Sequence, residues 1–204
     1  MIRRSLGPLL LFACCAAAQD APHIDVSINA AGVLSKSSNS STGSLTLKPT
    51  DSLEEFGSVR WNVNRKHALQ LNIGHTDNSQ FFTLPPNNYR VPAAITELSG
   101  AYVYTPLRTA RFSPFLLGGA GALRFSPGNS YINGLLSAFP VTQQTSLAFV
   151  YGAGTDYHLW KIFALRFQYR GLFYKNPDFG QPNLATHAHG HLAEPAVGIV
   201  VKLF

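Results

Sequence analysis

From about residue 24 onward, apolar and polar residues alternate one by one, and this period of two constrains the fold more than any other feature. Near the start, Ile24, Val26 and Ile28 alternate with Asp25 and Ser27. Successive side chains of a β-strand point to opposite faces, so the pattern predicts strands with one apolar and one polar face. It recurs in eight segments, at residues 24–30, 58–63, 69–73, 97–104, 115–125, 149–157, 163–170 and 197–203.

The connections between these segments alternate between short and long. Short turns are expected at residues 64–67, 105–111 and 158–161, and long polar connections at about residues 34–53, 76–94, 126–146 and 175–190. A barrel that spans an outer membrane has this asymmetry, with short turns at the periplasmic end and longer loops at the extracellular end. We therefore predict an all-β fold, an eight-stranded antiparallel up-and-down transmembrane β-barrel with four long extracellular loops.

Charged residues indicate which face of each strand points outward. The polar faces carry Asp25, Arg60, Glu97, Arg124, Asp156, Arg166, Arg170 and Lys202. A basic side chain facing the middle of the bilayer costs roughly 2–4 kcal/mol, and the lumen of an eight-stranded barrel is just wide enough to be filled by side chains. We therefore expect the apolar faces to contact lipid and the charged faces to fill a closed lumen.

The same reasoning predicts specific contacts. Inside the lumen, we expect the acids Glu97 and Asp156 to pair with Arg60, Arg166 or Arg170. For Arg124, a position at the extracellular rim in contact with water alone stays open as an alternative. In the fifth segment, the face predicted to contact lipid is formed by Phe115, Leu117, Leu123 and Phe125.

Aromatic residues gather near the ends of the predicted strands. One group lies near the short turns: Trp61, Tyr104, Phe112, Tyr157, Trp160 and Phe204. A second group lies near the long loops: Phe56, Phe125, Phe149, Phe173 and Tyr174. Amphipathic rings prefer the two membrane interfaces, so we predict two aromatic girdles. The alternative is a soluble β-protein whose aromatic side chains are buried in its core.

The first 18 residues have the features of a cleaved export signal. Arg3 and Arg4 precede an apolar run at residues 6–13, and small residues at 16–18 form a cleavage site. We therefore predict a signal peptide at residues 1–18 and a barrel domain at residues 19–204. The two cysteines of the sequence, Cys14 and Cys15, lie inside this signal, which leaves the mature chain without thiols. A lipoprotein signal with a lipidated Cys14 is the alternative.

The charge composition excludes a nucleic-acid partner and fits contact with lipid. The formal charge of +6 falls to +4 without Arg3 and Arg4, and the remaining basic residues form no cluster of the kind that nucleic-acid binding requires. Only 13% of the residues are charged, about half the usual fraction. No later segment approaches the roughly 18 consecutive apolar residues of a membrane helix. We therefore expect lipid contact through strands and no nucleic-acid partner.

Candidate catalytic and metal-binding residues are few. His75, Asp77 and Ser79 lie near one predicted loop, and His187, His189 and His191 lie in another. Neither group has the tight His-x-Ser spacing of a lipid A deacylase, so we predict no catalytic residues and no cofactor. Histidines two residues apart could bind zinc or copper from one side of an extended segment. Because loop residues are usually solvated, we predict no metal site, with metal binding by this group left open.

Three segments and the last residue resemble the OmpA-like and opacity-type outer-membrane β-barrel superfamily. The segments are residues 114–121 (PFLLGGAG), 151–157 (YGAGTDY) and 164–170 (ALRFQYR), and the last residue is Phe204. The resemblance implies a place in the bacterial outer membrane, with its lipids and lipopolysaccharide as partners. It also implies that the barrel-assembly machinery reads the strand ending at Phe204. Lys202 departs from the family pattern, which has an apolar or aromatic residue at that position.

Together these observations predict a non-enzymatic integral outer-membrane barrel that serves envelope integrity or displays loops for adhesion or binding. Two alternatives from other classes are a lipid A-modifying enzyme with its site at the rim and a secreted lipocalin-like carrier of a small ligand. The loops contain no recognisable binding motif, so the sequence identifies no extracellular ligand.

Overall fold

The computed structural model describes residues 23–41, 43–137 and 139–203. The predicted signal peptide at residues 1–18, with Cys14 and Cys15, lies outside the described residues, and so does Phe204. No helix in the described part of the chain is long and apolar enough to cross a membrane.

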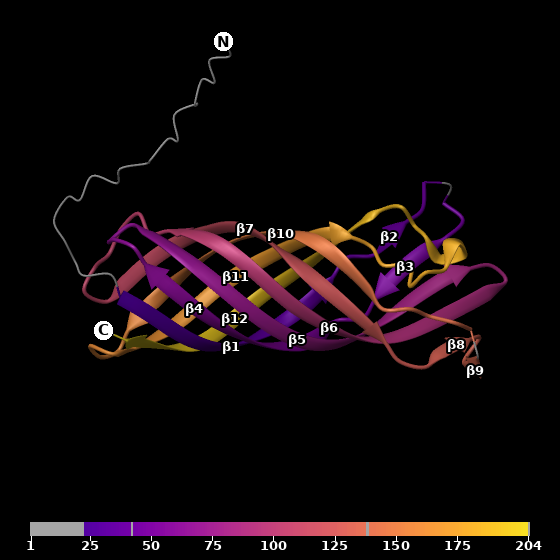
Figure 1. The fold of residues 1–204 in the computed structure, drawn as a ribbon, viewed down its shortest axis with the longest axis horizontal. Coiled ribbons are helices and arrows are strands. Elements are labelled where there is room, and N and C mark those ends of the chain that lie inside the picture. The colour runs from indigo at the N-terminus through magenta and orange to yellow at the C-terminus, as the bar shows by residue number, and fades with distance from the viewer. Residues whose placement is uncertain (1–22, 42, 138, 204) are drawn as a thin grey trace, which may run out of the picture.

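Eight long antiparallel strands form a closed barrel within the described residues (Figure 1). The strands are β1 (His23–Ser35), β4 (Ser52–Asn62), β5 (His67–Leu84), β6 (Asn87–Tyr104), β7 (Phe112–Pro127), β10 (Gln144–His158), β11 (Phe163–Lys175) and β12 (His189–Leu203). Each pairs with its neighbours in the chain, and β12 closes the barrel against β1, from Ile24 opposite Leu203 to Ser35 opposite Leu192. This confirms the predicted eight-stranded barrel.

Short turns lie at one end of the barrel, which we call the turn end, and the longer excursions lie at the other, the loop end. The turn end holds residues 63–66, 105–111 and 159–162, together with the start of β1 and the end of β12, on the left in Figure 1. Asn64 shows why the first turn is tight, because its Oδ1 accepts hydrogen bonds from the backbone N–H groups of Lys66 and His67, both at 2.9 Å. Such Asx turns stabilise reversals of the chain.

The second of the four predicted loops is instead an extension of two strands. Residues 76–94 continue β5 and β6 well beyond the other strands, and only Pro85 and Pro86 lie between them. The prediction of a long polar connection was wrong here because both faces of the extension carry polar residues. Thr76, Asn78 and Gln80 nevertheless point inward, because they continue the alternation of the preceding part of β5.

Three connections between barrel strands cover the loop end. The first contains β2 (Ser38–Asn39) and β3 (Thr46–Pro49), and β3 pairs with the extended β5. The second contains β8 (Ser130–Ile132) and β9 (Leu135–Ser137), and β8 pairs with the extended β6. The last contains a short 3-10 helix, η1 (Pro182–Leu184). The long hairpin β5–β6 thus serves as a scaffold for the neighbouring loops.

Side chains alternate between the outside and the lumen as predicted for seven of the eight strands. Outward-facing apolar residues such as Ile28, Leu71 and Leu147 are 75%, 64% and 82% exposed. In strand β7 the predicted faces were reversed. Its predicted lipid-facing residues point into the barrel, while Leu116 and Arg124 point outward; the inward set is Phe115, Leu117, Leu123 and Phe125. Both faces of β7 are largely apolar, so alternation alone could not orient this strand.

The aromatic girdles are present in part. At the turn end, Trp61, Phe112 and Trp160 are at least half exposed, as an interfacial position requires. At the loop end, Phe149 and Phe173 point outward. The prediction was wrong for three other residues at the loop end, which are buried inside the barrel: Phe56, Phe125 and Tyr174.

Candidate functional site

The lumen near the turn end holds one acid between two arginines. Asp156 accepts hydrogen bonds from Arg166 Nε at 2.7 Å and Nη2 at 2.9 Å, and from Arg60 Nη1 at 3.2 Å. The ring of Phe115 lies against both guanidinium groups, with its centre 4.2 Å from Cζ of Arg60 and 5.5 Å from Cζ of Arg166. Bidentate pairing and cation–π contact offset the loss of water around these charges. The structure therefore contains the predicted pairs of Asp156, and they explain why Phe115 points inward.

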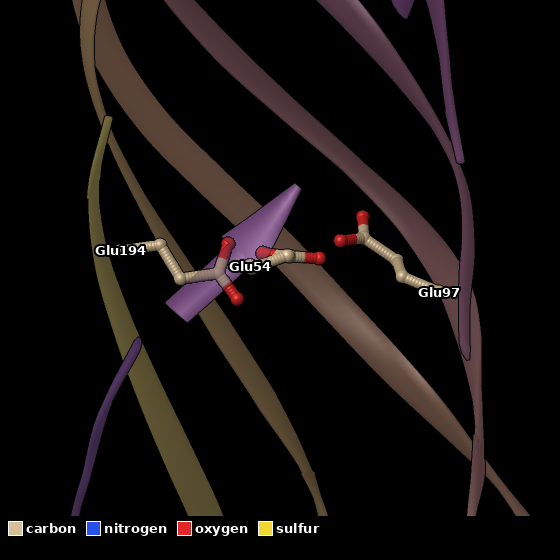
Figure 2. A group of neighbouring side chains, drawn as sticks. All are labelled: Glu54, Glu97 and Glu194. Atoms are coloured by element: carbon tan, nitrogen blue, oxygen red, sulfur yellow. The ribbon is translucent and has the colours of Figure 1, made fainter. Parts of the chain in front are cut away.

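A second cluster lies further toward the loop end and centres on Arg170. Its Nη2 donates to Glu97 at 2.9 Å, to Glu54 at 3.2 Å and to Glu194 at 2.6 Å. Figure 2 shows the three carboxyl groups converging from β4, β6 and β12. The ring of Phe56 covers the guanidinium group, 3.9 Å from Cζ. The pair of Arg170 with Glu97 was predicted; Glu54 and Glu194 were not.

Uncharged polar side chains connect the two clusters. Arg60 Nε donates to Gln70 Oε1 at 2.8 Å, and Gln70 Nε2 donates to Asn72 Oδ1 at 2.6 Å. Asn72 Nδ2 donates in turn to Ser99 Oγ at 3.0 Å, and Ser99 Oγ donates to Glu97. All of these residues are buried. A continuous chain of hydrogen bonds therefore runs along the lumen and joins both charge clusters, so that most of the buried polar groups have partners.

An apolar cluster fills the barrel above the charges, at the loop end. Phe179, from the connection between β11 and β12, is fully buried there, with its ring edge-on to Phe82 and Phe125 at centroid distances of 6.3 and 6.4 Å. Its backbone φ of 53° is unusual for a residue with a side chain. Gln144 Oε1 stabilises this conformation by accepting hydrogen bonds from the N–H groups of Asp178 and Phe179, at 2.9 and 3.0 Å.

The remaining predicted lumenal charges lie nearer the ends of the barrel. Asp25 is buried near the turn end and accepts a hydrogen bond from Asn62 at 2.8 Å. Lys202, opposite Asp25 in the pairing of β12 with β1, is partly exposed. Arg124 was wrongly assigned to the lumen: it is exposed on the outer face near the loop end, where its Nη2 donates to Gln143 at 2.8 Å. The alternative, a rim position in contact with water alone, holds for the exposure of Arg124 but not for its contacts, because the side chain is bonded to Gln143.

The structure does not assemble the predicted catalytic candidates. His75, Asp77 and Ser79 form a row on the outer face of β5, and no hydrogen bond joins their side chains in the described part of the chain. A serine–histidine pair that sequence spacing gave no reason to connect lies at the turn end instead, where Ser113 Oγ and His158 Nε2 are 2.8 Å apart.

That serine–histidine pair lacks the third group of a hydrolytic triad. His158 Nδ1 is buried without a hydrogen-bond partner among the described residues. Asp156, two residues away on the same face, pairs with arginines instead. A catalytic histidine needs a carboxylate or comparable group to orient it as a base. The geometry therefore supports a structural hydrogen bond between Ser113 and His158.

Two groups of residues have the chemistry to hold a metal ion. The carboxylate oxygens of Glu54, Glu97 and Glu194 lie within 4.8 Å of one another, but Arg170 already donates to all three and supplies the positive charge. His189 and His191 share the outer face of β12, whereas His187 precedes the strand. Within the described residues the three histidines do not form a three-ligand group.

The fold and its polarity define a class of protein. Strands with an apolar outer face and a lumen of paired charges form a transmembrane β-barrel, the inverse of a lipocalin-like carrier. Residues 6–190 match the model of the family described as "Outer membrane protein beta-barrel domain". The chain belongs to this family and is a protein of the bacterial outer membrane. Its turn end is therefore periplasmic and its loop end extracellular.

Solved structures with the same fold share little sequence with this chain. OprG from Pseudomonas aeruginosa is 13% identical, with 90% of this chain and 96% of that chain covered and a TM-score of 0.59. Ail of Yersinia pestis, in complex with the heparin analogue sucrose octasulfate, is 12% identical, with 89% and 99% covered and a TM-score of 0.54. Neisserial surface protein A is 16% identical, with 87% and 96% covered and a TM-score of 0.53. No curated protein sequence matches the chain.

Proposed function

We propose that this protein is a closed, non-enzymatic outer-membrane barrel that acts through its outer surface and its extracellular loops, in envelope integrity or in adhesion and binding. The observation that carries the proposal is the filled lumen. Two charge clusters joined by hydrogen bonds occupy its lower and middle parts, and the apolar cluster around Phe179 occupies its extracellular end. Transport through such a lumen would require breaking buried ion pairs, which is energetically costly.

Planar-bilayer recording of the purified barrel tests this proposal. The wild-type protein is expected to produce no conductance steps. In the double variant Arg170→Ala with Phe179→Ala, the first change removes the cation of the cluster centred on Arg170, and the second removes the ring that fills the extracellular end. This variant is expected to produce flickering conductance. Lys175→Ala with Leu135→Ala changes only exposed residues and serves as the control. Regular, stable conductance steps from the wild type would contradict a closed lumen.

The extracellular loops are the proposed binding surface. Ser41, Asn129 and Asn183 are exposed in three different loops. If each is replaced by cysteine, a membrane-impermeant maleimide is expected to label it on intact cells. If shortening a loop reduces the adhesion of the cells while the barrel stays folded, this result supports a binding role. If the same change makes the cells more sensitive to detergent and leaves adhesion unchanged, it supports a role in envelope integrity.

Enzymatic modification of lipid A is the competing function. The Ser113–His158 pair lies at the periplasmic end, and the residues at the outer face of β5 do not form a triad. We therefore expect no change in labelled lipid A incubated with the purified barrel. Deacylation that is abolished by Ser113→Ala would overturn the non-enzymatic proposal.

Export and assembly complete the proposal. We propose that residues 1–18 are removed as a signal peptide and that the barrel-assembly machinery recognises the last strand through Phe204. Mass spectrometry of the mature protein is expected to place the new N-terminus at Gln19. Phe204→Ala is expected to slow the appearance of heat-modifiable, folded barrel in the outer membrane, and an unchanged rate would exclude this recognition.

A further inference from the structure

A hollow of about 640 Å³ lies on the outer wall of the barrel near its extracellular end. Strands β10, β11 and β12 form its floor, and the segment that follows β1 overhangs it. Two hydrogen bonds to carbonyl groups of β12 hold the overhang: Lys36 N donates to His191 O at 3.0 Å, and the side-chain Oγ of Ser38 donates to His189 O at 3.3 Å. The hollow therefore has a defined shape and opens toward the outer leaflet of the membrane.

The lower part of the hollow is aromatic. Phe149, Tyr151 and Phe173 point outward there and are 57%, 38% and 47% exposed. Gly171 lets the Tyr151 ring lie flat on the barrel wall, because a Cβ at that position would be 2.3 Å from the ring. These rings form a surface against which an acyl chain can pack.

The upper part of the hollow carries hydrogen-bond donors and positive charge. Lys36 and His189 line it together with Ser37, Ser38 and Asn39, whereas His191 lies opposite Phe173 at the level of the rings, and no acidic residue lines the hollow. The pairing of β11 with β12 places Lys175, which is also exposed, opposite His189. Lys175 and His189 lie two residues beyond Phe173 and His191 along their strands toward the extracellular end, so these basic groups lie on the extracellular side of the aromatic floor.

We propose that this hollow binds a phosphorylated lipid of the outer leaflet, with the phosphate held by Lys36 and His189 and an acyl chain packed on Phe149, Tyr151 and Phe173. The proposal rests on the outer-membrane location and extends the proposed function by naming a site and a ligand class. Charge complementarity favours a phosphate as the ligand group, and the aromatic floor favours a lipid over free phosphate.

The side-chain contacts favour this ligand over a metal ion. His191 Nε2 is already hydrogen-bonded to Tyr151 Oη at 2.7 Å. The ring of His189 stacks on Phe173, with a centroid distance of 5.2 Å and an interplanar angle of 9°. Both imidazoles are thereby held in place by aromatic neighbours.

Native mass spectrometry of the detergent-solubilised barrel tests the proposal with bisphosphorylated lipid A and its dephosphorylated form. The wild type is expected to bind the phosphorylated lipid at least about tenfold more tightly, because charge-assisted hydrogen bonds to phosphate are lost with the dephosphorylated form. Lys36→Gln with His189→Gln is expected to remove this preference. Lys48→Gln with His75→Gln replaces the same two residue types at exposed positions outside the hollow and is expected to keep this preference.

Three results would overturn the proposal. They are equal binding of the two lipids by the wild type, an equal loss of binding in both double variants, and complete competition by millimolar inorganic phosphate. Zinc binding that depends on His189, without any lipid preference, would assign the hollow to a metal instead. Heat-modifiable mobility on gels verifies that each variant is folded, and bilayer recordings are independent of this site, so a failure here is distinguishable from failure of the closed-lumen proposal.

Discussion

Arg170→Met provides the sharpest test of the buried charge cluster. Arg170 is fully buried and donates four hydrogen bonds to three carboxylates, at distances between 2.6 and 3.2 Å. Methionine retains much of the side-chain volume but removes the only cation that contacts Glu54, Glu97 and Glu194 among the described residues. Removing one partner of a buried ion pair costs about 3–5 kcal/mol, because the other charge is left uncompensated.

The assay is reversible urea unfolding of the barrel in lipid vesicles, followed by the fluorescence of Trp61 and Trp160. Arg170→Met is expected to lower the free energy of unfolding by about 3–5 kcal/mol. Adding Glu54→Gln, Glu97→Gln and Glu194→Gln to the variant removes the uncompensated charge and should restore part of the loss. Lys175→Met, on the exposed end of the same strand, should change stability by no more than about 0.5 kcal/mol.

A loss below about 1 kcal/mol in Arg170→Met, close to that of a surface substitution, would refute this reasoning. It would mean that the carboxylates are neutral or hydrated in the native barrel and do not depend on Arg170. Failure of the three glutamine substitutions to restore any stability would instead show that the loss comes from packing against Phe56.

Three further changes test other parts of the structure by the same unfolding assay. Phe179→Ala leaves a cavity in the apolar cluster at the extracellular end and should cost about 3–5 kcal/mol, whereas a cost below about 1 kcal/mol would show that this loop does not pack into the barrel. Gly74→Ala places a Cβ 2.1 Å from Glu54 Oε1 and should cost about 1–3 kcal/mol, while the matched control Gly118→Ala, with open space around its Cβ, should be nearly neutral. Asp156→Asn leaves Arg60 and Arg166 without their acid and should cost about 3–5 kcal/mol; an unchanged midpoint would exclude a stabilising role for this pair.

The alternation of apolar and polar residues and the lengths of the connections were sufficient to predict the barrel, the number of its strands, and which end carries the short turns. They work because an amphipathic strand has one energetically acceptable orientation between lipid and lumen. Alternation did not orient β7 correctly, because both faces of this strand are apolar and tertiary packing determines which face points into the lumen. Phe115 points inward to contact Arg60 and Arg166, and Phe125 points inward to join the cluster around Phe179.

The charge clusters could be predicted only in part. Asp156, Glu97 and their arginines lie in clearly alternating segments. Glu54 adjoins Glu55, and only one of two neighbouring residues can face the lumen; continuing the alternation back from Arg60 would have selected Glu54. The fully buried Phe179, and the hydrogen bond between Ser113 and His158, depend on contacts between distant parts of the chain for which the local sequence carries no signal.

The orientation of β7 tests the central claim most directly, because the claim requires alternate residues of each strand to contact lipid. Nitroxide labels can be attached to cysteines introduced one at a time at positions 115–123, and their accessibility to oxygen dissolved in the bilayer measured by electron paramagnetic resonance. The structure predicts high accessibility at positions 116, 120 and 122 and low accessibility at 115, 117 and 123. The opposite phase, or equal accessibility at both sets of positions, would contradict a barrel with this polarity.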